Sequence, residues 1–213
     1  MIKLYFLNIN TIASNEAHFL SLLSESRSKK ALSYKIKNDM LRFTAGSILI
    51  KTIFGTDNIS YSHNGKPYIP DASEFNLSHS GEWAVLALSD VSVGVDIESI
   101  DKTYDMLQKL INSRVFSDAE RSFICKYHDI DAFYTIWTMK ESLFKCDGAG
   151  TIANCVFSSD GKFLTGKPFS SYRISICTKA LQKEIYSYIL EFEDDFSTKL
   201  IPINIDLTEP RLT

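Results

Sequence analysis

The sequence has no long apolar run and no excess of positive charge. No uninterrupted apolar stretch approaches the roughly 20 residues of a membrane-spanning helix, and the opening MIKLYFLNIN lacks the basic segment, apolar core and cleavage site of a secretion signal. Lys and Arg number 23 against 26 Asp and Glu, which gives a net charge of -3. Bulk charge therefore favours neither nucleic acid nor a membrane surface as a partner, and any phosphate binding must be local.

Cysteine is also scarce. The four cysteines, at positions 125, 146, 155 and 177, form no C-x-x-C pair and are too few for a disulfide scaffold. They are typical of thiols in a reducing compartment. We therefore expect a cytoplasmic protein, monomeric, with no nucleic-acid and no membrane partner.

The sequence has enough apolar residues for a core, and it contains both helical and strand-like periodicity. The 213 residues are 45% apolar, which suits one domain or two small ones. Helical and strand-like segments recur in each half, which predicts an α+β (α/β) fold with two similar lobes, 1–92 and 93–213. The expected strands are 3–10, 75–77, 83–88, 93–98, 173–177, 186–192 and 200–207, and the expected helices are 15–25 (capped by Ser14), 38–53, 117–127 and 129–147.

The stretch GVDIE, within the expected strand 93–98, places two acids together. Alternation puts Gly94, Asp96 and Glu98 on one face of the strand. Two carboxylates about 6 to 7 Å apart along a strand can converge on one cation, and we expect Gly94 to leave space in front of them. Oxygen ligands of this kind suit Mg²⁺. Taken alone, the pattern is more typical of a solvent-facing strand end than of a metal site.

The expected helix 129–147 carries the second informative stretch. Trp137, Glu141 and Lys145 are four residues apart and share one face, which we expect to line a cleft. A Glu–Lys pair at this spacing is also common on ordinary surface helices. Four apolar side chains are expected to point toward the core: Ile136, Met139, Leu143 and Phe144. A capping box at Ser117 and Glu120 begins the preceding helix, and Gly148 ends this one.

The first half offers candidate anion-binding groups. Basic residues cluster between Arg27 and Lys37, and Arg42 follows in the next expected helix. Pro67 pushes Lys66 toward an extended conformation. Residues 78–81, Ser-His-Ser-Gly, are expected to form a turn after a short strand, where backbone amides can face an anion. A solvated basic surface and a plain hairpin turn are the alternative interpretations.

Together, GKP, FNLSHSG, GVDIE and W-x-x-KES-x-x-K, in this order, make the chain resemble the Sfp-type 4'-phosphopantetheinyl transferases, from the basic cluster to about residue 150. The resemblance implies two similar lobes in a pseudo-twofold arrangement with coenzyme A as co-substrate. It also implies Mg²⁺-dependent transfer of the phosphopantetheine arm to a serine of an apo acyl or peptidyl carrier protein, as in a holo-[acyl-carrier-protein] synthase. The KES form resembles the branch serving nonribosomal peptide and similar pathways.

The resemblance also implies roles for individual residues. The metal ligands would be Asp96, Glu98 and Glu141, and Lys145 would meet the pyrophosphate. Glu141 is the candidate for taking the serine proton, with Glu98 as the alternative, and Lys140 would have a supporting role.

Groups in both halves would contact the two substrates. The residues matching coenzyme A contacts are Lys29, Arg42, Lys66, Ser78 and His79. Ser26 stands where the family commonly has a basic residue. The carrier protein would meet the segment 114–127, through Val115, Phe116, Ile124 and Tyr127.

Two other functions remain open from the sequence. A non-catalytic module of the same fold would bind coenzyme A or a carrier protein without turnover. A Mg²⁺-dependent phosphodiesterase would use the same acids, but it would not explain the GKP and SHSG stretches.

Overall fold

The chain forms two compact units. The computed structural model describes residues 1–127, 129–148, 152–154, 156–180, 182 and 184–210. The first unit comprises residues 1–90 and 183–204, and the second comprises residues 91–182 and 205–213. We predicted a boundary between residues 92 and 93. The chain changes unit two residues earlier, and it returns to the first unit for two strands that we had assigned to the second lobe.

The sheet of the first unit has the order β10-β9-β1-β5-β4. Its strands are β1 (Ile2–Asn8), β4 (Glu74–Ser80), β5 (Trp83–Ser89), β9 (Ile185–Phe192) and β10 (Thr198–Ile203). β1 pairs antiparallel with β5 and parallel with β9, which explains why a late segment of the chain belongs here. A separate short ribbon joins β2 (Ser60–Tyr61) to β3 (Pro67–Tyr68).

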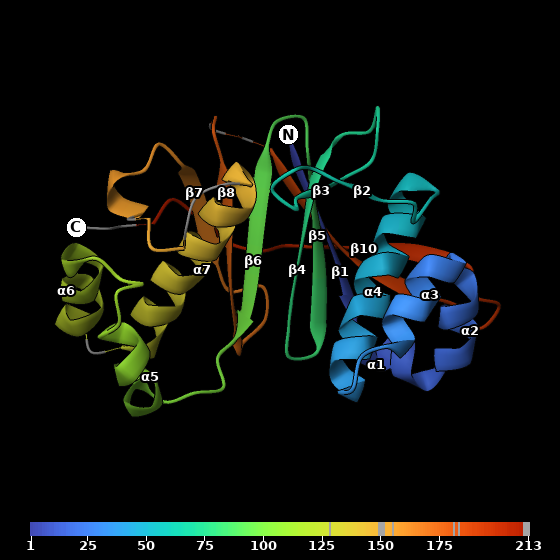
Figure 1. Cartoon of the computed structure of the whole chain (residues 1–213), viewed down its shortest axis with the longest axis horizontal. Helices are drawn as coiled ribbons and strands as arrows, with labels where there is room; N and C mark the ends of the chain where they lie inside the picture. The colour runs from blue at the N-terminus through green and yellow to red at the C-terminus, as the bar shows by residue number, and fades with distance from the viewer. Residues whose placement is uncertain (128, 149–151, 155, 181, 183, 211–213) are drawn as a thin grey trace. The chain divides into compact units, whose positions relative to one another are not determined.

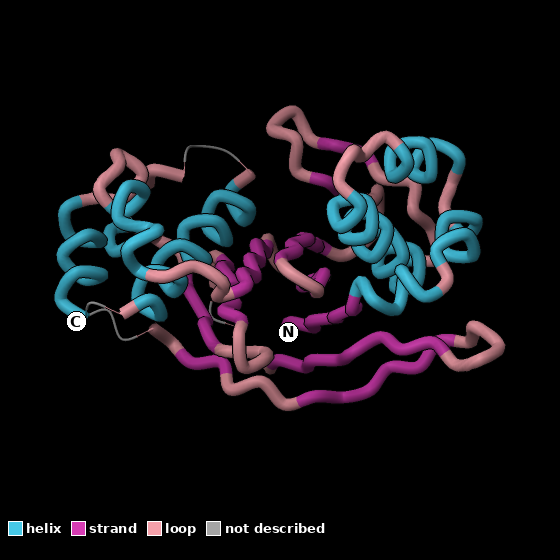
Figure 2. The backbone as a smooth tube through the Cα atoms, turned by 90° about the horizontal axis from the view of Figure 1, so that it is seen from below, coloured by secondary structure: helices cyan, strands magenta, loops and turns pink. Residues whose placement is uncertain are grey.

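Four helices gather on one side of this sheet (Figures 1 and 2). They are α1 (Ile9–Ser14), α2 (Glu16–Leu22), α3 (Glu25–Leu32) and α4 (Lys37–Phe54). The predicted helix 15–25 was wrong in its boundaries, because the chain breaks between Leu22 and Glu25. Ser14 is the last residue of α1 rather than a cap, and the side chain of Asn8 caps α1 instead.

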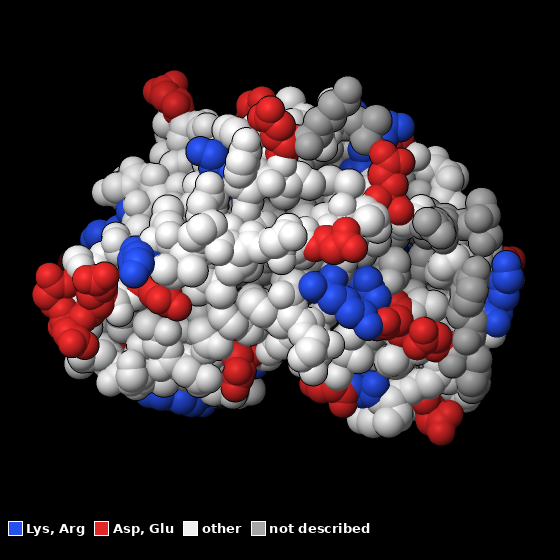
Figure 3. Space-filling model, turned by 180° about the vertical axis from the view of Figure 1, so that it is seen from behind, with Lys and Arg blue, Asp and Glu red and all other residues white. Residues whose placement is uncertain are grey.

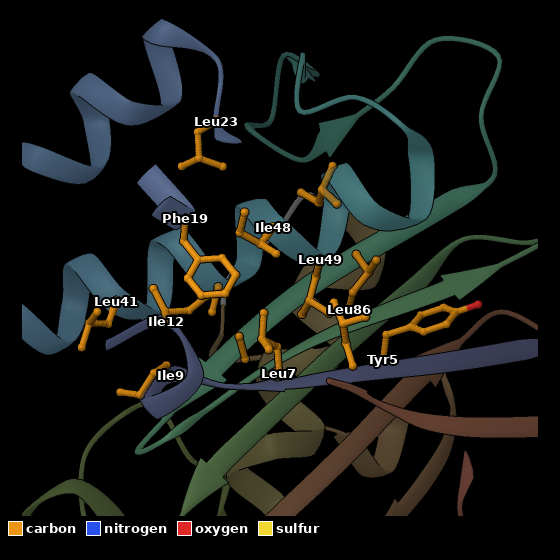
Figure 4. Packing of buried hydrophobic residues seen from close by; sticks show 14 of the residues in the cluster. Tyr5, Leu7, Ile9, Ile12, Phe19, Leu23, Leu41, Ile48, Leu49 and Leu86 are labelled. Carbon is orange, nitrogen blue, oxygen red and sulfur yellow. The ribbon is translucent and has the colours of Figure 1, made fainter. Parts of the chain in front are cut away.

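The long helix α4 supplies the core of the first unit. Figure 4 shows Leu49 of α4 beside Leu86 of β5, and Ile48 beside Phe19 of α2. All four are at most 2% exposed. Gly55, in the left-handed region at φ 73°, ends the helix, as is common for a residue just past a C-terminus.

The second unit places one long helix on a second antiparallel sheet, of order β11-β7-β8-β6. The strands are β6 (Val93–Ser99), β7 (Lys162–Gly166), β8 (Tyr172–Thr178) and β11 (Leu207–Thr208), and the helices are α5 (Tyr104–Ile111), α6 (Asp118–Tyr127), α7 (Ile130–Asp147) and the 3-10 turn η1 (Val156–Ser158). α7 packs mainly on β6 and β8. The predicted mixed α+β class is confirmed.

The helix ends of the second unit follow the sequence signals. The Ser117 amide donates to Glu120 Oε2 at 2.7 Å and the Glu120 amide donates to Ser117 Oγ at 3.2 Å, so the capping box is confirmed. Asp129 caps α7 by accepting from the Asp131 amide at 3.0 Å. Gly148, at φ 61°, ends α7 as predicted.

The surface carries both signs of charge. On the face drawn in Figure 3, acidic and basic side chains lie in small interspersed groups. Among the described residues, no helix combines the length and the apolar character that crossing a membrane requires. Cys125 is exposed and Cys146 and Cys177 are buried free thiols, while Cys155 lies outside the described residues.

Candidate active site

Helix α7 lies directly on the face of β6 that carries the two acids. A Cβ atom added to Gly94 would stand 1.9 Å from the backbone oxygen of Ser142 and 2.4 Å from the backbone nitrogen of Cys146. Only a residue without a side chain permits this approach. The expectation that Gly94 leaves open space was therefore wrong, because the backbone of α7 fills it.

Contacts along the helix fix the direction in which α7 crosses β6. The indole nitrogen of Trp137 donates to Glu98 Oε1 at 3.2 Å, and Lys145 Nζ donates to Asp96 Oδ1 at 2.6 Å. The two elements thus run in opposite directions. Glu141 is one helical turn from both Trp137 and Lys145, so it lies opposite the interval between the two β6 acids. The predicted shared face of α7 is the face turned toward these acids.

The electrostatics of Glu141 reflect this position. Burial raises its pKa above the ordinary value, the nearby positive charge of Lys145 acts in the opposite direction, and the negative charge of Glu98 raises the pKa further. Asp96, whose side chain is 5% exposed, forms an ion pair with Lys145, whose side chain is 24% exposed. Three carboxylates and one ammonium therefore gather between β6 and α7.

Aromatic packing orients the donor on Glu98. The Trp137 ring stacks on Phe133 with ring centroids 6.1 Å apart and an interplanar angle of 10°, and it also lies near Phe116. This packing holds the indole N–H toward Glu98. Sequence reasoning placed Trp137 on the correct face but missed its hydrogen bond to Glu98. The four-residue spacing between Trp137 and Glu141 was the available signal.

The three carboxylates are chemically suitable ligands for a magnesium ion. Asp96, Glu98 and Glu141 offer only oxygen ligands, which Mg²⁺ prefers. With Lys145, they carry a summed formal charge of about -2 when ionised, which a divalent cation would balance. Among the described residues, no three acidic, histidine or cysteine side chains lie close enough together to hold one ion. The ammonium of Lys145 instead holds one oxygen of Asp96.

Comparison with known proteins identifies the family. Residues 92–198, which contain this entire cluster, match the 4'-phosphopantetheinyl transferase superfamily. The chain is 32% identical to the 4'-phosphopantetheinyl transferase Sfp of Bacillus subtilis (strain 168) over 163 residues, which cover 70% of this chain and 71% of the relative. The chain belongs to the 4'-phosphopantetheinyl transferase superfamily.

Other relatives agree with this transferase assignment. The 4'-phosphopantetheinyl transferase gsp of Aneurinibacillus migulanus is 30% identical over 163 residues, covering 70% of this chain and 67% of the relative. A human L-aminoadipate-semialdehyde dehydrogenase-phosphopantetheinyl transferase is 29% identical over 130 residues, covering 50% of this chain and 42% of the relative. The family and the transferase class predicted from the motifs are confirmed.

Two of the predicted coenzyme A contacts of this transferase lie on a strand rather than in a turn. Ser78 and His79 belong to β4, which runs to Ser80, so the expected turn at residues 78–81 was wrong in extent. The strand continues because Ser80 still pairs with Trp83 of β5. Ser78 is buried and His79 is exposed. The turn begins only at Gly81, at φ 53°.

The basic candidates of the first unit have different surroundings. Arg42 Nε donates to the Gly81 carbonyl oxygen at 2.9 Å, which brings α4 to the β4–β5 turn. Lys66 forms an ion pair with Glu74 at 3.0 Å. Lys29 pairs with Glu25 on its own helix, and its side chain is 75% exposed. The structure thus joins Arg42 to the end of the SHSG stretch, whereas the recorded ion pair of Lys29 stays within α3.

Arg27 occupies the place next to Ser26, where the sequence departs from the common pattern of the family. Its Nη2 donates to Ser47 Oγ of α4 at 2.7 Å, and its guanidinium lies 4.4 Å from the centroid of the Phe43 ring. These contacts tie α3 to α4. Arg27 therefore has a packing role in this unit.

Three expectations about apolar side chains need correction. Phe116 and Ile124, which we expected to contact a carrier protein, are 1% and 0% exposed and belong to the core of the second unit. Phe144, expected in the core, is 40% exposed. Phe144 lies about 140° around the helix axis from the buried Met139, so it lies on the outward side of the helix. The side chain of Tyr127 lies outside the described residues.

Proposed function

We propose that this transferase moves the phosphopantetheine arm of coenzyme A onto a serine hydroxyl of an apo acyl or peptidyl carrier protein and releases adenosine 3',5'-bisphosphate. In reaction terms it would be a holo-[acyl-carrier-protein] synthase of the Sfp type. The observation that supports this most strongly is the approach of α7 to β6 at Gly94, which sets Glu141 and Lys145 opposite Asp96 and Glu98.

Asp96, Glu98 and Glu141 are the residues we propose as Mg²⁺ ligands. Bound there, the ion would offset the negative charge of a diphosphate and act as a Lewis acid on it. Lys145, already directed at Asp96 at 2.6 Å, would turn its ammonium toward the pyrophosphate oxygens and stabilise negative charge that develops on the leaving group. A positive side chain at this place suits an anionic substrate.

Glu141 is our candidate for accepting the proton of the attacking serine. Burial and the negative charge of Glu98 raise the pKa of Glu141 in the metal-free protein, which favours proton acceptance, whereas a bound Mg²⁺ would lower this pKa. Glu98 is the alternative, although the Trp137 N–H already engages one of its oxygens at 3.2 Å. A hydrogen bond to the ionised form weakens a carboxylate as a base, which favours Glu141.

For the nucleotide part of coenzyme A we propose Arg42, Lys66, Ser78, His79 and Lys29. Arg42 and the SHSG stretch are joined through Gly81, which supports a common role for them. Lys145 is a further residue that we propose to contact coenzyme A. We further propose a cytoplasmic monomer that serves nonribosomal peptide or polyketide carrier proteins, as the KES form of the α7 motif indicates.

The test is incubation of the protein with coenzyme A, Mg²⁺ and an apo carrier protein, followed by intact-mass measurement of the carrier. We expect the carrier to gain the mass of one phosphopantetheine. Hydrolysis of coenzyme A with an unchanged carrier would instead support a phosphodiesterase, and binding without either product would support a non-catalytic module.

A further inference from the structure

A buried ion pair lies on the other side of α7 from the β6 acids. Lys140 Nζ is 2.9 Å and 3.0 Å from the two carboxylate oxygens of Glu120, and both side chains are 0% exposed. Lysine and glutamate are rarely buried to this degree unless they are paired. Removing two charges from water costs several kcal/mol for each ion. Burying this pair for packing alone would therefore be unfavourable.

The polar atoms of this pair are extensively hydrogen-bonded. Lys140 also donates to the Asn154 carbonyl oxygen at 2.7 Å, and its ammonium lies 5.8 Å from the centroid of the Phe116 ring. Glu120 accepts from the Ser117 amide at 2.7 Å and from the Val156 amide at 2.9 Å. Its position in the first turn of α6 adds the favourable field of a helix N-terminus.

The pair thereby joins three segments of the chain. Glu120 lies at the start of α6 and Lys140 in the middle of α7. Val156 is the first residue of η1, and Asn154 lies two residues before it. Apolar contacts on α7 are non-directional and tolerate small sliding motions. Hydrogen bonds between charged groups have fixed lengths and directions, so they define both the axial position and the rotation of a helix.

Lys140 immediately precedes Glu141, which points about 100° away around the helix axis. A helix held by Lys140 toward α6 therefore presents Glu141 toward β6. We propose that the Lys140–Glu120 ion pair is a positioning device for Glu141, and that it sets the height of this carboxylate over Asp96 and Glu98. This inference rests on the proposed role of Glu141 in transfer. Lys140 and Glu120 are positioning residues, since neither side chain would touch substrate.

The main test is a double variant that removes both charges, Lys140→Met/Glu120→Gln. Glutamine keeps the shape of Glu120 and one acceptor oxygen, so one of the two amides, Ser117 (to Oε2) or Val156 (to Oε1), loses its acceptor. Each single change leaves an uncompensated buried charge, so we expect the single variants to unfold at lower urea concentration than the wild type. The double variant removes both buried charges and should recover part of that loss.

Transfer should not recover in the double variant. We expect kcat at least about tenfold below wild type, because small misplacements of a catalytic group are costly, with the KM for coenzyme A within about threefold of wild type. A folded double variant with wild-type kcat would show that the pair serves stability alone. Should the double variant fail to fold, Glu120→Asp decides: it keeps the charge, shortens the side chain and should lower kcat in a folded protein, whereas a wild-type kcat there would overturn the inference.

Two controls separate this inference from the proposed function. Lys179→Met removes surface ion pairs with Asp147 and Asp160, each at 2.7 Å, and should leave kcat unchanged. Glu141→Gln should abolish most transfer. If Glu141→Gln transfers at the wild-type rate, the proposed role of Glu141 fails. If only that variant loses activity and the double variant does not, the positioning inference alone fails.

Discussion

The replacement Gly94→Ala adds a single methyl group at the closest approach of α7 to β6, and it therefore tests this contact. The added carbon would lie 1.9 Å from Ser142 O, 2.4 Å from Cys146 N and 3.0 Å from Cys146 Cα. All three are backbone atoms, so no side-chain rotation relieves the clash. The helix must retreat from the strand by about 1.5 Å, or the strand must bend, before the methyl group reaches the 3.4 Å at which ordinary van der Waals contact begins.

Both stability and chemistry should respond. Overpacking lowers the free energy of unfolding by about 1–3 kcal/mol. Because this clash is with the backbone, we expect a loss at or beyond the upper end of that range. Because Glu141 and Lys145 are carried by α7, a displacement of about 1.5 Å should also lower transfer by about a hundredfold or more. Urea unfolding measures the first effect, and the rate of mass gain by an apo carrier protein measures the second.

Gly46→Ala is the matched control. Gly46 lies within α4, and a Cβ there would meet only Leu77 side-chain atoms, the nearest at 3.7 Å. Ordinary contact and better helix propensity predict a gain of about 0.5–1 kcal/mol, with transfer unchanged. The reasoning is refuted if Gly94→Ala keeps both wild-type stability and wild-type transfer.

Three further predictions follow from the same cluster. The pKa of Glu141 is higher in the folded protein than in the unfolded chain, so ionisation of Glu141 lowers the free energy of unfolding as the pH rises through these two pKa values. Glu141→Gln should therefore be more stable than wild type at pH 7. Urea titrations should show this difference shrinking toward pH 3. Trp137→Phe removes the donor to Glu98 but retains an aromatic ring against Phe133, so kcat should fall by about tenfold, the loss of roughly one charge-assisted hydrogen bond, without unfolding. Chelation with EDTA should stop transfer reversibly, and added Mg²⁺ should restore it; unaffected transfer would remove the metal from the account.

Local signals allowed the second unit to be predicted well. The capping box at Ser117 and the stop at Gly148 depend on residues within a few positions, and both were confirmed. The sequence left Asp129 and Asp131 open as the cap of α7, and the structure has Asp129 there. The alternation of GVDIE likewise indicated which face of β6 carries the acids. Each of these patterns depends on backbone geometry that short stretches of sequence determine.

Features that depend on distant parts of the chain were missed. The role of Gly94 depends on α7, which follows it by about 50 residues, so the sequence could not distinguish open space from a packed helix. Glu120 was identified as a capping residue, but its second partner, Lys140, comes from another helix. The parallel pairing of β9 with β1 joins the two ends of the chain and assigned residues 183–204 to the first unit.

The first unit also shows how tertiary pairing overrides turn chemistry. Ser, His and Gly at 78–81 are typical turn residues, yet β4 continues to Ser80 because β5 pairs with it throughout. Phe144 illustrates the reverse case, since an apolar residue in an apolar helix was expected in the core but is exposed. Phe144 lies about 140° around the helix axis from the buried Met139, so helical periodicity alone separates it from the core face.

The most direct test of the central claim is the binding of Mn²⁺, as a spectroscopic substitute for Mg²⁺, measured by electron paramagnetic resonance in the presence of coenzyme A. We predict that one ion binds per wild-type chain and that binding weakens strongly in both Glu98→Gln and Glu141→Gln, because each removes a carboxylate ligand from a different element. Equal Mn²⁺ affinity in the wild type and both variants would contradict the account, since the β6 and α7 acids would then not share a cation.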